Sequence, residues 1–275
     1  AGADANDALN ITVNGTNAAA SNLTTLYGKT SLKITVDAAK VTGLFADLKD
    51  IYVTNKSKFT ALGNENVDIT GLPAVESSDV NTILKATTGV VTATNVVADS
   101  AANLVANLKD ANAKDALTLT VTGMASAKDL LTLVNKTSKN LVTTGVTTIT
   151  GTAAEVKKVY DTLKTGVVGD EDITLTGTVK AVDANYILGS TSGVGVGVVT
   201  ATIAADTAAN LNNTLTNASA TDKLKLTVNG ATASATALNS LATKTSLAIK
   251  VDAKEITGIG ADLATLYINA AGEFA

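Results

Sequence analysis

The stretch KTSLKITVDA, Lys29–Ala38, returns near the other end of the chain as KTSLAIKVDA, Lys244–Ala253. It belongs to a longer ungapped match, in which residues 9–52 align with residues 224–267 and 23 of 44 positions are identical. A match that keeps one constant offset over its whole length indicates that the chain is built from internal repeats.

The middle of the chain carries a third, looser copy of the pattern. LNITVNG at Leu9 returns as LTLTVTG at Leu117 and as LKLTVNG at Leu224, so the three copies are almost evenly spaced. We therefore expect one continuous domain over residues 1–275 that contains three modules. The expected modules are approximately 9–116, 117–223 and, as a partial copy, 224–275.

Each module is predicted to alternate strands with short helices. Leu32, Ile34 and Val36 alternate with polar residues, which is strand spacing. Residues 38–52 follow, with apolar residues at helical spacing, and Asp37 stands where an N-cap belongs. The same N-cap position is predicted for Asp99, Asp206 and Asp252.

About ten such strand–helix units follow one another at nearly regular intervals. The strand-like segments begin near Leu9, Leu32, Val67, Val90, Leu117, Val146, Ile173, Val198, Leu224 and Leu247. A unit this short cannot bury its apolar strand face alone, so neighbouring units have to stack. The prediction is a right-handed α/β solenoid, a stack of about ten strand–helix coils with one parallel β-sheet. Coils made only of strands would give a β-helix-like variant.

The composition argues against several kinds of site. The chain has no Cys, no His and no Arg, so all 21 basic residues are lysines. The commonest general base, thiolate ligands and bidentate Arg contacts are therefore missing. A net charge of −4 and a pI near 4.9 argue against nucleic acid, which binds to basic surfaces. We expect no enzyme, no catalytic residues and no evident cofactor, and the lack of long apolar runs predicts no membrane-spanning segment.

The densest acidic cluster is GDED, residues 169–172. Asp170, Glu171 and Asp172 are candidate ligands of Ca²⁺, because this ion prefers carboxylate oxygens. Their spacing fits neither an EF-hand loop nor the Gly-Gly-x-Gly-x-Asp nonapeptide. The competing interpretation is a solvated turn between a helix and a strand.

Two segments resemble known proteins. VTTITGTAAEVKKVYDTL, residues 146–163, and ALGNENVDIT, residues 61–70, resemble phrases of repeat-rich exported proteins of the bacterial cell surface. These include surface-layer proteins and giant adhesins of the type I secretion kind. The resemblance implies an extracellular location at the bacterial cell surface, but no particular activity. The Ca²⁺-binding nonapeptides that often accompany type I export are absent here.

Two functions from different classes follow as hypotheses. The first is a structural, self-assembling subunit of a surface layer or an extracellular filament, because unpaired end strands can pair with other copies of the chain. The alternative is an adhesin repeat or ligand-binding module, with residues 54–66 as the candidate loop and a cell-surface glycan as the candidate partner. An aromatic content of only 3% and the lack of Arg count against this alternative.

Overall fold

The computed structural model describes residues 2–163, 170–191, 197–269, 272 and 274. The chain forms two compact units. Unit 1 comprises Ala1–Thr122 and Leu131–Val142, and unit 2 comprises Gly123–Leu130 and Thr143–Ala275.

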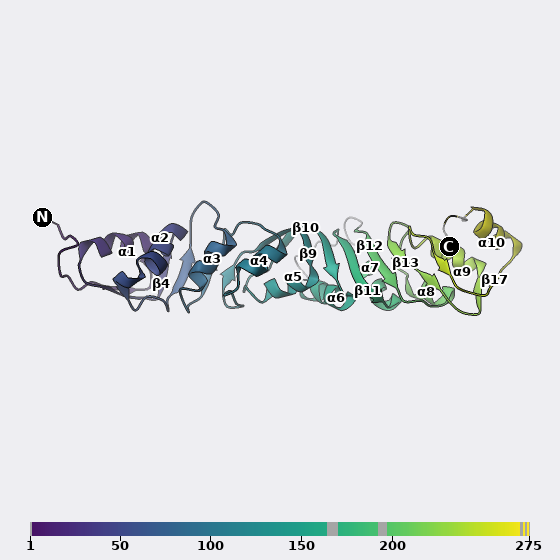
Figure 1. The fold of residues 1–275 in the computed structure, drawn as a ribbon, viewed down its shortest axis with the longest axis horizontal. Coiled ribbons are helices and arrows are strands. Elements are labelled where there is room, and N and C mark those ends of the chain that lie inside the picture. Colours follow the sequence, from purple (N-terminus) through teal and green to yellow (C-terminus); the bar gives the residue numbers. More distant parts are fainter. Residues whose placement is uncertain (1, 164–169, 192–196, 270–271, 273, 275) are drawn as a thin grey trace. The chain divides into compact units, whose positions relative to one another are not determined.

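Unit 1 alternates short strands with short helices (Figure 1). Its strands are β1 (Thr12–Gly15), β2 (Ala18–Ala19), β3 (Ile34–Ala38), β4 (Lys40–Gly43), β5 (Phe59–Thr60), β6 (Asn66–Ile69), β7 (Val91–Ala93) and β8 (Ala116–Leu117). Its α-helices are α1 (Ala20–Leu26), α2 (Phe45–Lys49), α3 (Ser77–Leu84) and α4 (Ala101–Asn107). It also contains the short 3₁₀-helices η1 (Tyr27–Lys29) and η3 (Lys56–Lys58) and the π-helix η2 (Asp50–Thr54). The strands form two sheets, β1-β3-β5 and β2-β4-β6-β7-β8.

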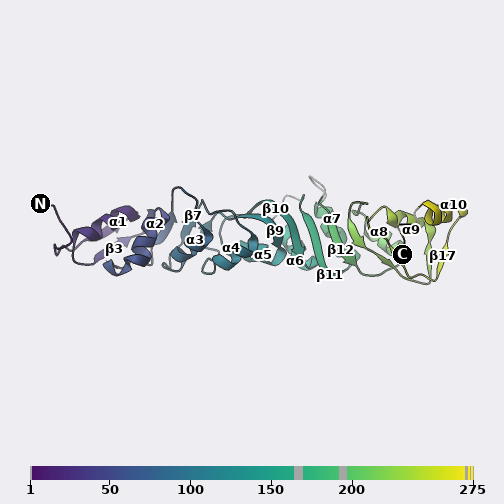
Figure 2. The same cartoon turned by 45° about the horizontal axis from the view of Figure 1, so that its top comes forward.

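Three elements contribute residues to both units: β9 (Thr120–Ser126), α5 (Ala127–Val134) and β10 (Val142–Gly151). The other strands of unit 2 are β11 (Asp172–Val179), β12 (Val199–Ile203), β13 (Lys223–Lys225), β14 (Thr227–Val228), β15 (Thr232–Ser234), β16 (Lys250–Val251) and β17 (Glu255–Thr257). Its helices are α6 (Ala153–Thr162), α7 (Ala181–Thr191), α8 (Ala208–Thr214), α9 (Ala235–Ala242), α10 (Gly260–Ala264) and η4 (Thr265–Asn269). Figure 1 shows β11, β12 and β13 side by side, and Figure 2 shows β11 beside β12. The sheet order is β13-β12-β11-β10-β9, and the pairs β14-β16 and β15-β17 follow it in the chain.

The strand pairs with a described register are parallel in both units, and each joins corresponding strands of successive repeats, as Thr12 pairs with Thr35 and Lys40 with Asn66. The predicted solenoid with one parallel sheet is nevertheless wrong, because the described strands form five separate sheets with α-helices between the strands. These helices also exclude the strand-only, β-helix-like variant for the described residues.

Left-handed glycines lie where two of the extended runs are interrupted. Gly15 has φ 107° and Gly230 has φ 112°, a backbone conformation that other residues rarely adopt. Each of these glycines interrupts an extended run, so β1 pairs with β3 while β2, which follows shortly after, pairs with β4. In these repeats one predicted strand therefore corresponds to two short strands in two sheets, whereas β9 and β11 continue through Gly123 and Gly177, which also have positive φ.

The predicted helix over residues 38–52 is also wrong in its first half. Residues 40–43 form β4, and the helix α2 begins only at Phe45. Asp37 lies inside β3 and is not an N-cap.

Two further N-caps lie one residue after the predicted aspartates. Ser100 and Thr207 cap α4 and α8, and their hydroxyls accept hydrogen bonds from the N–H groups of Asn103 and Asn210. Asp99 and Asp206 accept the N–H groups of these two caps at 2.7 Å, so each carboxylate supports the cap from one position before it. Asp252 likewise begins no helix, since α10 starts only at Gly260.

The repeated Lys-Thr-Ser phrase is explained by a buried threonine. The Thr30 hydroxyl donates to the carbonyl oxygen of Leu9 at 2.7 Å and accepts the Leu9 N–H at 3.1 Å. Thr137 makes the same pair of bonds with Leu117, at 2.7 and 3.0 Å. Thr245 repeats them with Leu224 at 2.7 and 3.1 Å. Each phrase thus fixes a corner of one repeat to the strand before it.

The lysine of the phrase has a structural role in two of its copies. Lys136 Nζ donates to the carbonyl oxygen of Leu108 at 2.6 Å, and Lys244 Nζ donates to that of Leu215 at 2.8 Å. Leu108 and Leu215 are the C-cap residues of α4 and α8. An ammonium group at this position satisfies a terminal carbonyl and favours the negative end of the helix dipole.

Candidate functional site

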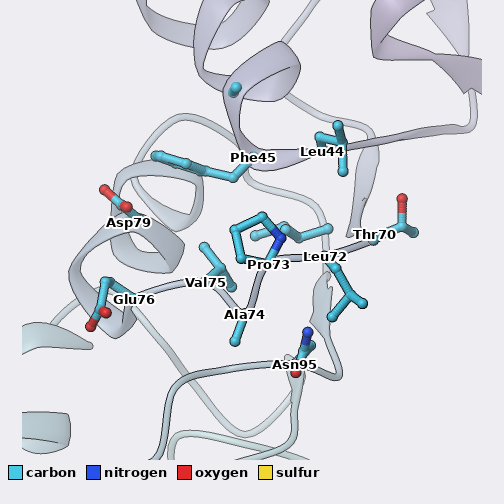
Figure 3. A pocket seen from close by; sticks show the side chains of 13 residues that line it. Leu44, Phe45, Thr70, Leu72, Pro73, Ala74, Val75, Glu76, Asp79 and Asn95 are labelled. Atoms are coloured by element: carbon cyan, nitrogen blue, oxygen red, sulfur yellow. The ribbon is translucent and has the colours of Figure 1, made fainter.

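A pocket of about 240 Å³ opens in unit 1 beside the loop that follows β6 (Figure 3). Leu44 and Phe45, at the start of α2, form one wall. Loop residues 72–75 lie opposite them, and the side chains of Glu76, Asp79 and Asn95 lie at the margin. The pocket is therefore apolar in its body and bears two carboxyl groups on one side.

The loop itself explains why a pocket forms here. Gly71 follows β6 with φ 86°, and a side chain at this position would overlap with Leu44. The Leu72–Pro73 peptide bond is cis, and Leu72 is 80% exposed. Val75 returns the chain to the fold through a bridge with Val96. The residues between Gly71 and Val75 consequently stand away from the sheet.

The second copy of this segment has no such loop. Gly71 lies six positions before α3, whereas its counterpart Gly177, with φ 76°, lies only four positions before α7. In the second copy β11 continues through this region, where Thr178 pairs with Thr202. The first copy therefore has a two-residue insertion, which forms the pocket loop. Insertions in repeats often form the binding face.

The pocket was not predicted from the sequence. A signal was present, because Pro73 is the single proline of the chain and lies in the two-residue insertion. The segment 54–66, which was predicted as the candidate loop, is mostly ordered structure. It contains η3 and β5, and Glu65 within it is buried.

The acidic cluster at 170–172 has its carboxylates partly engaged by the protein. Glu171 is 4% exposed, and its Oε1 accepts a hydrogen bond from the Tyr160 hydroxyl at 2.7 Å. Asp172 Oδ1 accepts the Val198 N–H at 2.9 Å. Asp170 is exposed, while Gly169 lies outside the described residues. Within the described part of the chain, no group of three or more acidic side chains is placed to hold a metal ion.

The same arrangement occurs at the equivalent residues of the first module. The Tyr52 hydroxyl donates to Oε2 of Glu65 at 3.1 Å, and the Gly63 N–H donates to the same oxygen at 2.8 Å. Asn66 Oδ1 accepts the Val90 N–H at 2.9 Å, as Asp172 accepts that of Val198. Asn66 makes the same hydrogen bond to the backbone as Asp172 does, although it carries no charge. The recurrence therefore supports a structural role for this turn.

Burial acts strongly on both tyrosines of these pairs. Loss of solvent raises the pKa of Tyr52 well above 10.0, and the charge of Glu65 raises it further. The pKa of Tyr160 is raised for the same reasons beside Glu171. Both tyrosines therefore stay protonated at ordinary pH and serve as donors to a carboxylate, not as acids or bases.

No family model, curated protein or solved structure matches this chain. The function is therefore argued from the geometry of the chain itself.

A second unusual feature is β1, which lies at one edge of the sheet β1-β3-β5 among the described strands. Leu9, which precedes β1, is 43% exposed, whereas its repeat equivalents Leu117 and Leu224 are 0% exposed. The equivalents of Ile11 and Val13 are also fully buried, while these two residues are partly exposed. β1 thus presents an apolar strand surface that the other copies cover.

The edge at β17 shows a matching difference. Ile256 is partly exposed, whereas its equivalent Val41 is 0% exposed. Tyr267 is 62% exposed, whereas its equivalent Tyr52 is 1% exposed. β4, the equivalent of β17, pairs with β6, but β17 pairs only with β15 among the described strands.

No helix in the described ranges is long and apolar enough to cross a membrane.

Proposed function

We propose that this chain is a structural, self-assembling protein of the bacterial cell exterior, a subunit of a surface layer or an extracellular filament. Assembly uses the edge of β1 in one copy and the edge formed by β16 and β17 in another. The observation that carries the proposal is the parallel pairing of each strand with the corresponding strand of the next repeat, because a strand of another copy can continue such a stack.

The chemistry of the β1 edge selects its partner. Backbone N–H and C=O groups on an open edge favour the addition of another strand. Pairing within this chain is parallel, so an incoming parallel strand continues the observed register. Its inward residues have to be aliphatic, because they pack on Leu9 and Val13.

A second copy of the chain offers such a strand. Val251 and Ile256, in β16 and β17, are partly exposed, although their equivalents Val36 and Val41 are 1% and 0% exposed. Contact between two different edges is heterologous, and repetition of a heterologous contact that does not close on itself yields a filament. The residue Phe274 bridges Ile249 next to β16, so β17 is the more open of the two strands.

The extracellular location rests on the resemblance of residues 61–70 and 146–163 to exported repeat proteins, and on the composition. A chain without Cys cannot form unwanted disulfides in the oxidising conditions outside the cell. Its acidic net charge of −4 favours solubility before assembly.

Sedimentation velocity over a range of protein concentrations, with electron microscopy of the same samples, tests the proposal. The expected result is concentration-dependent growth into fibres or sheets. Val13→Lys should abolish growth because it places a charge on the apolar edge, whereas Thr12→Lys, on the exposed face of the same strand, should leave growth intact. Circular dichroism of both variants shows whether each is folded. A wild-type chain that stays monomeric at all concentrations, in Ca²⁺ and in EDTA, overturns the proposal.

The alternative function, a ligand-binding or adhesive module, is favoured by one observation, the pocket beside residues 72–75. Its apolar walls do not match the hydroxyl-rich surface of a glycan, so a cell-surface sugar has less support as the partner than an apolar molecule. Screening of the chain against immobilised glycans tests the sugar directly, and specific binding would restore it.

A further inference from the structure

We propose that the pocket in unit 1 binds a small organic ammonium ion, a primary amine carried on an apolar body. This inference does not depend on self-assembly, because every residue that lines the pocket belongs to unit 1. The volume of about 240 Å³ lies just below the ~300–1,000 Å³ of sites for drug-sized ligands, which favours a small molecule.

The body of the pocket selects the apolar part of the ligand. Leu44 and Leu72 are 46% and 80% exposed, so both retain apolar surface that a ligand can cover. Pro73 and Val75 complete this surface, and the Phe45 ring lies above it in Figure 3. Covering aliphatic and aromatic surface favours binding in proportion to the area removed from water.

The margin of the pocket selects the sign of the charge. Glu76 is the N-cap residue of α3, and Asp79 lies in the first turn of this helix. Neither side chain takes part in an ion pair or hydrogen bond found among the described residues. A cation is therefore attracted and an anion repelled.

The pocket lining itself carries no positive side chain. No lysine is among the lining residues, which are fully described. Lys49 Nζ lies 5.7 Å from the centre of the Phe45 ring and occupies one side of that ring. The ligand ammonium group is consequently assigned to Glu76 and Asp79, and its apolar body to the residues of the loop.

The second copy of the segment lacks this combination. Asp183 corresponds to Asp79, but Lys180 precedes α7 where Glu76 precedes α3. The two-residue insertion of the loop is also missing there. The second copy thus provides a matched control position, with one of the two carboxylates and no pocket loop.

The test is a titration followed by ¹H–¹⁵N NMR with three probes of equal length: hexylammonium, hexanol and hexanoate. We expect saturable shifts at Gly71, Leu72 and Asp79 with hexylammonium. Hexanol should bind about three- to tenfold more weakly, because it loses the contacts to the exposed Glu76 and the half-buried Asp79, and hexanoate should not bind. Added salt should weaken binding of the amine but not of the alcohol.

Substitutions separate the charge from the apolar surface. The double variant Glu76→Gln and Asp79→Asn should reduce the affinity for hexylammonium to that for hexanol and leave hexanol unchanged. Asp183→Asn, the matched control, should alter neither. Absence of saturable shifts, equal affinity for all three probes, or full retention of amine binding in the double variant would each overturn the proposal. Amine binding and self-assembly are read from separate measurements. Normal amine binding would therefore support this site whether or not the chain assembles.

Discussion

The hydroxyl of Tyr160 donates a 2.7 Å hydrogen bond to Oε1 of Glu171, and Tyr52 makes the equivalent bond to Glu65 at 3.1 Å in the first module. Both glutamates are 4% exposed. A carboxylate buried to this extent requires donors, since an unsatisfied charge in the interior is costly. The pair is therefore a structural element that the repeat reproduces, and it explains why GNEN at 63–66 and GDED at 169–172 are related.

Tyr52→Phe removes one of the donors to Glu65 and should reduce the free energy of unfolding by about 1–3 kcal/mol. The Gly63 N–H remains bound to the same oxygen, which keeps the loss within this range. Urea denaturation followed by circular dichroism measures the change. Tyr267→Phe is the control, because this repeat equivalent is 62% exposed and should lose less than about 0.5 kcal/mol. Equal effects of the two variants would contradict the assignment.

Alkaline pH should destabilise the protein through the same tyrosines. Their folded-state pKa is raised above the value of 10.0, so their contribution to stability is fully present below pH 10 and is lost as the pH rises toward the folded-state pKa. For each tyrosine the free energy of unfolding should fall by about 1.4 kcal/mol per pH unit in this window. Melts between pH 9 and pH 12 measure the slope. Tyr52→Phe should make it shallower, while an unchanged slope would show that Tyr52 ionises normally in the folded chain.

The internal repeat could be predicted from the sequence, and the structure gives it a physical basis. The phrase that recurs at Lys29, Lys136 and Lys244 carries a threonine that binds the backbone of the strand before it. The threonine that is identical in the three copies of the phrase is therefore one that binds the backbone. Spacing alone could reveal these positions without showing what they bind.

The number of sheets could not be predicted from the same pattern. Alternation at Leu32, Ile34 and Val36 indicates a strand, but it does not show where the strand breaks. Gly15 and Gly230 have positive φ where strands break, but Gly123 and Gly177 have positive φ inside the continuous strands β9 and β11. A glycine that permits this conformation does not by itself mark a break, so the prediction of one continuous sheet failed at Gly15 and Gly230.

The candidate sites illustrate a similar limit. Asp170, Glu171 and Asp172 attract attention because their charges are adjacent in the sequence, yet Glu171 and Asp172 accept hydrogen bonds from Tyr160 and Val198. The pocket, in contrast, joins Leu44 to residues 72–75 and Asn95, which are distant in the sequence. Only an alignment of the two modules around Gly71 and Gly177 would have exposed the two-residue insertion.

Thr137→Val should destabilise the protein, because it keeps the shape of the side chain and removes a buried hydroxyl. The hydroxyl donates to the Leu117 carbonyl and accepts N–H groups of Leu117 and Lys139, at 2.7, 3.0 and 3.1 Å. We expect a loss of about 1–3 kcal/mol in urea denaturation. Thr137→Ser retains the hydroxyl and should recover most of the loss. If valine and serine behave alike, packing rather than hydrogen bonding explains the recurring shape of this corner.

Gly89→Ala should strongly destabilise unit 1, because the new methyl group would overlap with the carbonyl group of Glu65. That carbonyl belongs to backbone and is held by the Thr87 hydroxyl at 2.7 Å, so it cannot move aside without breaking the corner. The expected loss is at least about 2 kcal/mol, measured by thermal and urea denaturation. Gly28→Ala is the control, since nothing lies within 4 Å of a side chain added there, and its change should stay within about 1 kcal/mol of the wild type. Gly197→Ala should reproduce the loss in unit 2, where the overlap is with the carbonyl group of Glu171. Wild-type stability of Gly89→Ala would mean that the turn at residues 63–66 moves to make room for the methyl group. The close contact between neighbouring repeats would then not explain why glycine occupies positions 89 and 197.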